Sequence, residues 1–144
     1  MKIARIWSGT WLCLGVCLGA SSAMADLAIV VNPASPVTEI TADEIADLFL
    51  AKATRTAEGV RVIPVDQSEG GASRKQFYER VVKKSPSQLN SYWSRLIFTG
   101  KGRPPFAVAD DAEVIEFVAT NPSMIGYVST EAVTDQVKVV LTLQ

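Results

Sequence analysis

The segment Ser68–Arg74 gathers hydrogen-bond donors at the predicted start of a helix. It follows the apolar run Val60–Val65, which predicts a short strand, and its Gly70-Gly71 pair predicts the turn between the two. Free backbone N–H groups and the positive end of a helix dipole converge at such a point, and anions bind there. The predicted donors are the backbone N–H groups of Gly71, Ala72 and Ser73, the hydroxyls of Ser68 and Ser73, and the guanidinium of Arg74. The segment therefore predicts a small oxyanion as ligand, with Arg74 neutralising its charge.

Two acidic residues stand beside this turn. Asp66 and Glu69 would repel a dianion, but a carboxylate can also accept the proton of a monoprotonated oxyanion, so Glu69 stays among the predicted site residues. The alternative interpretation is an ordinary strand-to-helix turn, because Gly and Ser are common turn and cap residues. The residues alone leave both interpretations open.

Catalytic chemistry has few candidates in this chain. The sequence contains no His, which excludes Ser–His–Asp and Cys–His catalysis and the usual zinc sites. A hydrolase elbow around Ser68 lacks its first glycine as well as a base. We therefore predict a non-catalytic binding protein without a metal or cofactor.

The first 25 residues have the pattern of a secretory signal peptide. Lys2 and Arg5 precede the apolar run Trp11–Ala20, and Ala23-Met24-Ala25 is a typical cleavage site. We predict cleavage after Ala25, a periplasmic location, and one domain over residues 26–144. A retained anchor is one alternative. Acylation at Cys17 is another, although Val16 stands where a small residue is expected before the modified cysteine.

The composition of residues 26–144 narrows the class of partner. Both cysteines, Cys13 and Cys17, lie before this segment, so it has no disulfide. Removal of Lys2 and Arg5 leaves 12 basic residues against 15 acidic ones. A mildly acidic domain does not bind nucleic acid by bulk charge.

The predicted elements alternate between strands and helices. Apolar runs predict strands over residues 27–31, 60–65, 125–128 and 137–143, and apolar periodicity with capping signals predicts helices over about 42–52, 72–84, from 86 to 98, and after Asp110 or Asp111. This order predicts an α/β fold with a mainly parallel sheet flanked by helices. Asn32 and Ser35 follow the first strand, and we expect them at the sheet edge where ligands of open α/β sheets bind.

The helix predicted over residues 86–98 has an unusually complete apolar stripe. Its apolar residues follow the spacing of a buried face, and these are Leu89, Tyr92, Trp93, Leu96 and Ile97. We therefore expect Trp93 in the core rather than in a stacking platform. The following loop carries Lys101 and Arg103, and three interpretations are open: the loop completes an anion site, contacts a partner, or is simply solvated.

Three segments, in this order, resemble the phosphate-binding protein family of ABC transporters. Thr41–Lys52 is similar to an early family helix, Glu69–Ser73 to the family's (D/E)-G-S-G-T phosphate turn, and Asn121–Val128 to its P-G-A-I-G-Y-V strand. The resemblance implies a periplasmic-binding-protein-like (type II) domain and phosphate or a similar oxyanion as ligand. It also implies an ABC permease or a membrane sensor as partner.

The chain departs from this family in length and in its turn. Family members with proven phosphate sites have two lobes, whereas residues 26–144 have room for about one. If one chain forms only half a cleft, a homodimer is a way to complete it. Gly71 replaces a Ser, Ala72 a Gly and Ser73 a Thr, and Gln67 stands where an Arg is frequent. The alternative hypothesis is a protein-interaction or sensory module that kept the fold and lost the ligand.

Overall fold

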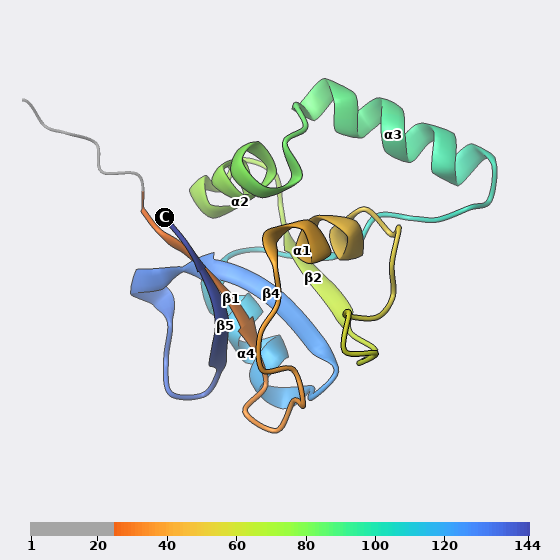
Figure 1. The fold of residues 1–144 in the computed structure, drawn as a ribbon. Helices are drawn as coiled ribbons and strands as arrows, with labels where there is room; N and C mark the ends of the chain where they lie inside the picture. Colours follow the sequence, from red (N-terminus) through yellow and green to blue (C-terminus); the bar gives the residue numbers. More distant parts are fainter. Residues whose placement is uncertain (1–24) are drawn as a thin grey trace, which may run out of the picture.

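The computed structural model describes residues 25–144, and the predicted signal peptide of residues 1–25 lies, except for Ala25, outside the described residues. Five strands form one sheet in the order β3-β2-β4-β1-β5 (Figure 1). The strands are β1 (Leu27–Val31), β2 (Ile63–Gln67), β3 (Phe106–Val108), β4 (Met124–Ser129) and β5 (Lys138–Leu143). The helices are α1 (Ala42–Phe49), α2 (Ala72–Phe77), the π-helix η1 (Tyr78–Val82), α3 (Pro86–Phe98), α4 (Asp111–Thr120) and the 3-10 helix η2 (Thr130–Ala132).

Four of the five strands run in the same direction. β2 pairs in parallel with both β3 and β4, while β1 lies antiparallel between β4 and β5. The predicted α/β class with a mainly parallel sheet is therefore confirmed. β3, which the sequence did not indicate, is a three-residue edge strand.

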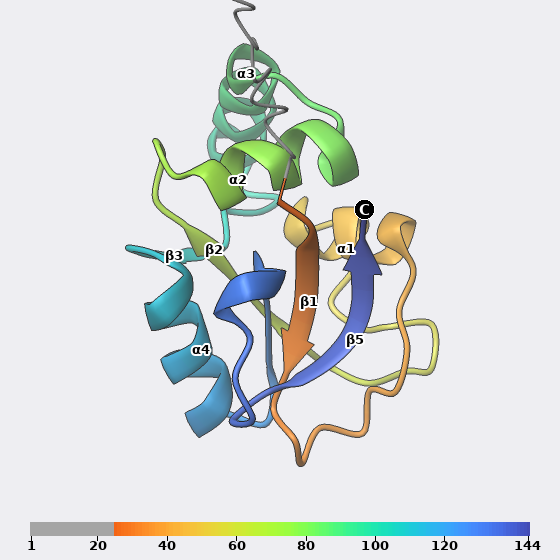
Figure 2. The ribbon, with the colours of Figure 1, turned by 90° about the vertical axis from the view of Figure 1, so that its left-hand side faces the viewer.

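Helices cover both faces of the sheet. α1, α2 and η1 lie on one face and α4 lies on the other, as the two ribbon views show (Figures 1 and 2). On the first face the rings of Phe77 and Tyr127 stack with centroids 4.0 Å apart, and Phe49 packs against both. All five residues of β1 are buried, because both faces of this strand are covered.

The helix boundaries follow local capping chemistry. The predicted capping box is present at α1, where Thr41 Oγ1 accepts from the backbone N–H of Glu44 at 3.3 Å and the Glu44 carboxylate accepts from that of Thr41 at 2.8 Å. The same carboxylate accepts from Ala57 N at 2.7 Å. Both backbone bonds lower the pKa of Glu44. α1 ends at Phe49 rather than at residue 52, since Ala51 takes a left-handed conformation with φ 56°.

The helix expected over residues 72–84 is built in two parts. α2 passes directly into η1, and Lys83 ends η1 with φ 58°. The wider π turn keeps Tyr78, Val81 and Val82 on the buried side. The residues predicted to face the core therefore do so, although the helix type changes within the segment.

The predicted burial of α3 is only partly correct. Leu89 is buried, and Tyr92 and Trp93 are half-buried, but Ile97 is 57% and Phe98 92% exposed. The Tyr92 hydroxyl donates to Leu50 O at 2.6 Å, while the distal half of α3 extends away from the domain (Figure 1). Apolar spacing shows which face of a helix avoids water, but it does not show whether the same chain covers that face. No helix within residues 25–144 is long and apolar enough to cross a membrane.

Replacing Gly126 by Ala is expected to destabilise the fold by about 1–3 kcal/mol. Gly126 lies in β4, and an added Cβ would lie 2.6 Å from Val114 Cγ1, a buried atom of α4 that cannot move freely. Urea denaturation measures the change. Gly102→Ala is the matched control, because its Cβ would approach the flexible end of Leu96 at 3.2 Å and would make an ordinary contact with Ala51 Cβ at 3.7 Å. Equal losses in the two variants would contradict the close packing of β4 on α4.

Candidate functional site

The predicted strand–turn–helix unit is present at the carboxyl ends of the parallel strands. β2 ends at Gln67, and Ser68 N donates to Val108 O at the end of β3 at 2.8 Å. Gly70 has φ +96°, a conformation that favours glycine. The first N–H groups of any helix lack an intrahelical partner, and those of α2 receive no side-chain cap because its N-cap is Gly71.

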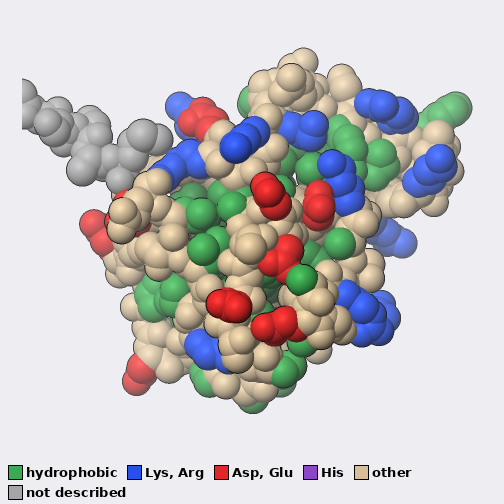
Figure 3. Space-filling model, in the orientation of Figure 1, with side chains coloured by type: hydrophobic (Ala, Val, Ile, Leu, Met, Phe, Trp, Pro, Cys, Tyr) green, Lys and Arg blue, Asp and Glu red, His purple; other side chains and the backbone are tan. Residues whose placement is uncertain are grey.

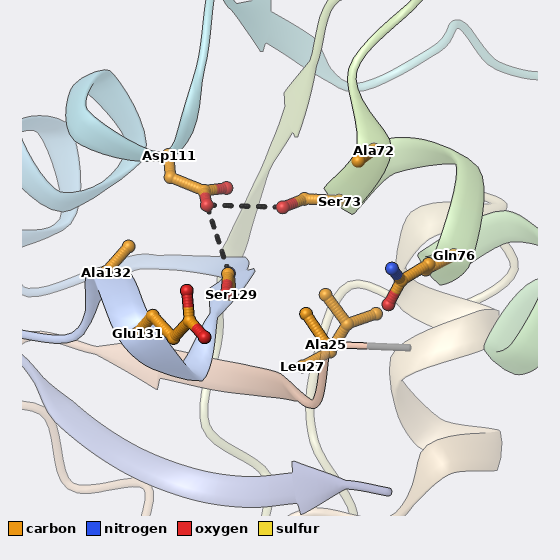
Figure 4. A pocket seen from close by; sticks show the side chains of 9 residues that line it. All are labelled: Ala25, Leu27, Ala72, Ser73, Gln76, Asp111, Ser129, Glu131 and Ala132. Atoms are coloured by element: carbon orange, nitrogen blue, oxygen red, sulfur yellow. Dashed lines mark hydrogen bonds between the residues drawn. The ribbon is translucent and has the colours of Figure 1, made fainter. Parts of the chain in front are cut away.

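Three donors from separate elements converge on the carboxylate of Asp111. Its Oδ1 accepts from Gln67 Nε2 at 2.7 Å, and its Oδ2 accepts from Ser73 Oγ and from Ser129 N, both at 3.2 Å. Figure 4 shows Asp111 of α4 and Ser73 of α2 pointing toward one another above the end of β4. We call the three donors Gln67, Ser73 and Ser129, together with the Asp111 carboxylate that accepts from them, the donor cluster. Because a carboxylate is itself an oxyanion, the cluster already holds one oxyanion supplied by the chain.

Asp111 is available for this contact because its neighbour caps α4. Asp110 Oδ1 accepts from Glu113 N at 3.0 Å, and Glu113 returns the contact by accepting from Ala109 N at 2.7 Å. The sequence left open which aspartate caps the helix. The structure assigns the cap to Asp110 and leaves the Asp111 side chain to face α2.

Two open pockets border the donor cluster. One, of about 410 Å³, extends toward Gln76, Ser129 and Glu131, and the other, of about 680 Å³, extends toward Asp110 and Thr134. Ser73 and Asp111 line both pockets, as does Ala72. Among the described residues, no lysine or arginine lines either pocket, so the local charge is negative.

Arg74 does not have the free charge that the sequence led us to expect. Its Nη1 donates to Asp66 Oδ2 at 2.6 Å and to Gln67 O at 2.8 Å, and its guanidinium carbon lies 4.5 Å from the centroid of the Tyr78 ring. Asp66 is 3% exposed and requires a nearby cation. Arg74 therefore stabilises the turn through its contacts with Asp66 and Gln67, and the Asp66 carboxylate balances its charge.

The Asp66 carboxylate has two further buried donors. The hydroxyls of Tyr78 and Tyr127 each donate to it at 2.5 Å. Burial, and then the negative charge of Asp66, raise the pKa of both tyrosines far above the usual range. Both hydroxyls therefore remain protonated donors throughout the range of pH in which the protein folds.

These tyrosines predict a loss of stability in alkali. Because the folded pKa of each lies above the unfolded value of about 10, their contribution is complete below pH 10 and is lost as the pH rises beyond it. The expected decrease in unfolding free energy is up to about 1.4 kcal/mol per pH unit for each tyrosine. Urea denaturation between pH 9 and pH 11 measures the slope, and Tyr127→Phe should reduce it. A stability that stays level above pH 10 would contradict the burial of both phenols.

Asn32 and Ser35 do not lie at this site, which corrects the sequence-based expectation. β1 is antiparallel to β4, so the carboxyl end of β1 lies at the opposite edge of the sheet from that of β4. There Asn32 Nδ2 donates to Val118 O at 3.0 Å and to Ala119 O at 2.8 Å, at the end of α4. Ser35 Oγ accepts from Val37 N at 3.3 Å. Both residues stabilise the loop after β1.

The remaining predicted residues lie together in the turn. Ser68 Oγ donates to Val108 O at 3.2 Å, Glu69 and Gly70 are exposed, and Gly71, Ala72 and Ser73 begin α2. Sequence analysis did not include Gln67, Asp111 and Ser129 in the site. A signal existed for Ser129, because it follows the strand Ile125–Val128 and the carboxyl ends of parallel strands meet at one edge.

Solved structures with the same fold come from phosphate transport proteins. An ABC-type phosphate transport receptor from Vibrio cholerae is similar with a TM-score of 0.62 and 21% identity, over 81% of this chain and 46% of that chain. A putative phosphate ABC transporter substrate-binding protein from Clostridium perfringens, solved with bound phosphate, has a TM-score of 0.61 and 22% identity, over 81% and 45% of the two chains. PstS from Borrelia burgdorferi has a TM-score of 0.59 and 14% identity, over 81% and 47%.

These similarities confirm the predicted resemblance at the level of the fold. The chain spans less than half the length of each of these structures, which fits a short single-lobe form. No family model and no curated protein sequence matches the chain.

Proposed function

We propose that this protein is an exported, non-catalytic solute-binding domain that takes a small oxyanion, phosphate by preference, at the start of α2. The observation that carries the proposal is the Asp111 carboxylate, which accepts from Gln67, Ser73 and Ser129. A ligand oxygen in that position would meet the same donors. The free N–H groups at the start of α2 would hold the other oxygens.

In this proposal the ligand competes with the chain's own carboxylate. Asp111 must turn away, or share a proton with the ligand, before a phosphate can use the donors at Gln67 and Ser73. The cost of moving Asp111 lowers the affinity, since no lysine or arginine lines the two described pockets to offset the charge of a dianion. We therefore expect a dissociation constant of roughly 10–100 μM rather than nanomolar binding.

The sequence supports the proposed location of the protein, and the fold supports the proposed class of partner. The signal-peptide pattern of residues 1–25 supports export to the periplasm. The similarity to an ABC-type phosphate transport receptor and to a putative phosphate ABC transporter substrate-binding protein supports an ABC permease as partner. A membrane sensor is the alternative partner.

Replacing Ser73 by Ala is expected to weaken phosphate binding about tenfold, because it removes a hydroxyl donor to a charged oxygen. Isothermal titration calorimetry of residues 26–144 measures the change. Ser87→Ala is the matched control, since Ser87 is exposed on α3 and far from the cluster along the chain. If Ser73→Ala bound phosphate as tightly as the unaltered chain, the assignment of the site would be incorrect.

A second candidate function is a protein-interaction or sensory module without a ligand. The specific observation in its favour is the balanced charge of Arg74, whose Nη1 donates to Asp66. A domain that had lost its ligand would also have no need to displace Asp111. The absence of any phosphate-dependent heat or rise in melting temperature would favour this function.

A further inference from the structure

The charges of residues 26–144 are segregated along the chain. The segment 80–109 has no acidic residue and six basic ones, which are Arg80, Lys83, Lys84, Arg95, Lys101 and Arg103. All 15 acidic residues of the chain lie in the segments 26–79 and 110–144, which together hold six basic ones. A protein of mildly acidic overall charge is therefore divided into a cationic part, which includes α3 and the loop after it, and a strongly anionic remainder.

The cationic part also carries the two most exposed large apolar side chains among the described residues. We call α3 and the loop 99–105 the arm. At its distal end Ile97 is 57% and Phe98 92% exposed, and Arg95, Lys101 and Arg103 are exposed beside them. Large exposed apolar side chains next to such charges are typical of binding surfaces.

An acidic surface of the same molecule lies on α1. Asp43 and Asp47 are four residues apart on the exposed side of this helix, and Glu39 is exposed just before it. Figure 3 shows acidic side chains gathered over α1 and basic ones over the arm above and to the right of it. Among residues 25–144, the only ion pair of the Asp47 carboxylate is with Lys52, at 3.9 Å between two exposed side chains.

We propose that a second copy of this chain covers the arm, with the arm of each protomer resting on the acidic α1 surface of its partner. Charge selects this arrangement, because pairing the two arms would bring cationic segments together. A two-fold axis makes the contact reciprocal, so one association forms two arm-to-α1 contacts. Ile97 and Phe98 would be removed from water at the same time. This proposal does not depend on ligand binding, since neither surface includes the donor cluster.

Sedimentation equilibrium of residues 26–144 at increasing salt provides the first test. That segment contains every described core residue and is therefore suitable for study alone. We expect a dimer with a dissociation constant on the order of 10–100 μM at about 0.05 M salt, weakened at least tenfold at about 0.5 M. Ile97→Ser combined with Phe98→Ser should weaken it at least tenfold at low salt. Dimers that are unaffected by both salt and these substitutions would overturn the proposal.

A charge exchange tests which surfaces meet. Arg95→Glu with Arg103→Glu makes one variant, and Asp43→Lys with Asp47→Lys makes the other. Each variant alone should be monomeric, whereas an equal mixture should form heterodimers, because each reversed surface then faces an opposite charge. Asp135→Lys is the control, since Asp135 is exposed in the loop before β5. Melting curves verify that each variant folds.

Two further outcomes would overturn the proposal. One is a mixture that stays monomeric while the unaltered chain dimerises, because the contacting surfaces would then be others. The other is a chain that is monomeric at every salt concentration and sediments with phosphatidylglycerol vesicles in a manner that Phe98→Ser abolishes. That result would assign the arm to a membrane surface instead.

Discussion

Replacing Asp66 by Ala is expected to lower the unfolding free energy by about 3–5 kcal/mol, the largest loss of stability that we predict for a single substitution. Asp66 is 3% exposed and accepts from Arg74, Tyr78 and Tyr127. Its removal leaves a guanidinium and two buried phenol groups without their acceptor, so the penalty includes the desolvation of each donor. Urea denaturation followed by circular dichroism measures the loss.

Two variants separate this explanation from simple truncation. Asp66→Asn keeps an acceptor oxygen but removes the charge that balances Arg74. Its unfolding free energy should therefore lie between those of Asp66→Ala and the unaltered chain. Asp135→Ala removes an exposed carboxylate and should change the stability by less than about 0.5 kcal/mol. A loss of less than about 1 kcal/mol for Asp66→Ala would contradict the buried network.

Replacing Asp111 by Asn is expected to tighten phosphate binding by about 10- to 100-fold, the largest gain that we predict. The substitution removes a negative charge from the donor cluster while keeping a side chain of nearly the same shape. Between two unit charges about 4 Å apart, the repulsion near a protein surface is of the order of 4 kcal/mol, so even a well-screened fraction of it gives this gain. Titration calorimetry at constant ionic strength measures the affinities.

The neighbouring Asp110 supplies the control for this prediction. Asp110→Asn removes one negative charge from the same pocket but keeps a side-chain oxygen to cap α4. The Asp110 carboxylate does not accept from Gln67, Ser73 or Ser129. The affinity of Asp110→Asn for phosphate should therefore rise by less than about threefold. Equal gains in the two variants would mean that Asp111 acts through general charge and does not occupy the ligand's position.

The strand–turn–helix unit could be predicted because its information is local. Apolar runs, glycines and capping residues such as Thr41 and Ser85 act within a few residues, and the structure places the elements close to where these signals indicated. The direction of β1 could not be predicted in this way. Its antiparallel pairing with β4 depends on a strand almost a hundred residues away, and that pairing moves Asn32 and Ser35 to the far edge.

The chemistry of the site could not be predicted from the sequence, for a similar reason. Arg74 and Asp66 are close in sequence, but only the burial of Asp66 at the end of β2 shows that the pair neutralises itself. Asp111 is 38 residues from Ser73, and its role depends on Asp110 taking the helix cap. Sequence patterns identified the donors of the turn, whereas the acceptor that they meet required the arrangement of α4 against α2.

The proposed function depends on phosphate binding at the start of α2 in competition with Asp111. Its most direct test is calorimetric titration of dialysed residues 26–144 with phosphate, with sulfate as the comparison ligand. We expect saturable heat at one site per chain, with a dissociation constant of roughly 10–100 μM, and a rise in melting temperature with added phosphate. No heat and no shift in melting temperature, for the unaltered chain and for Asp111→Asn alike, would contradict it and would leave the protein-interaction module as the function of this fold.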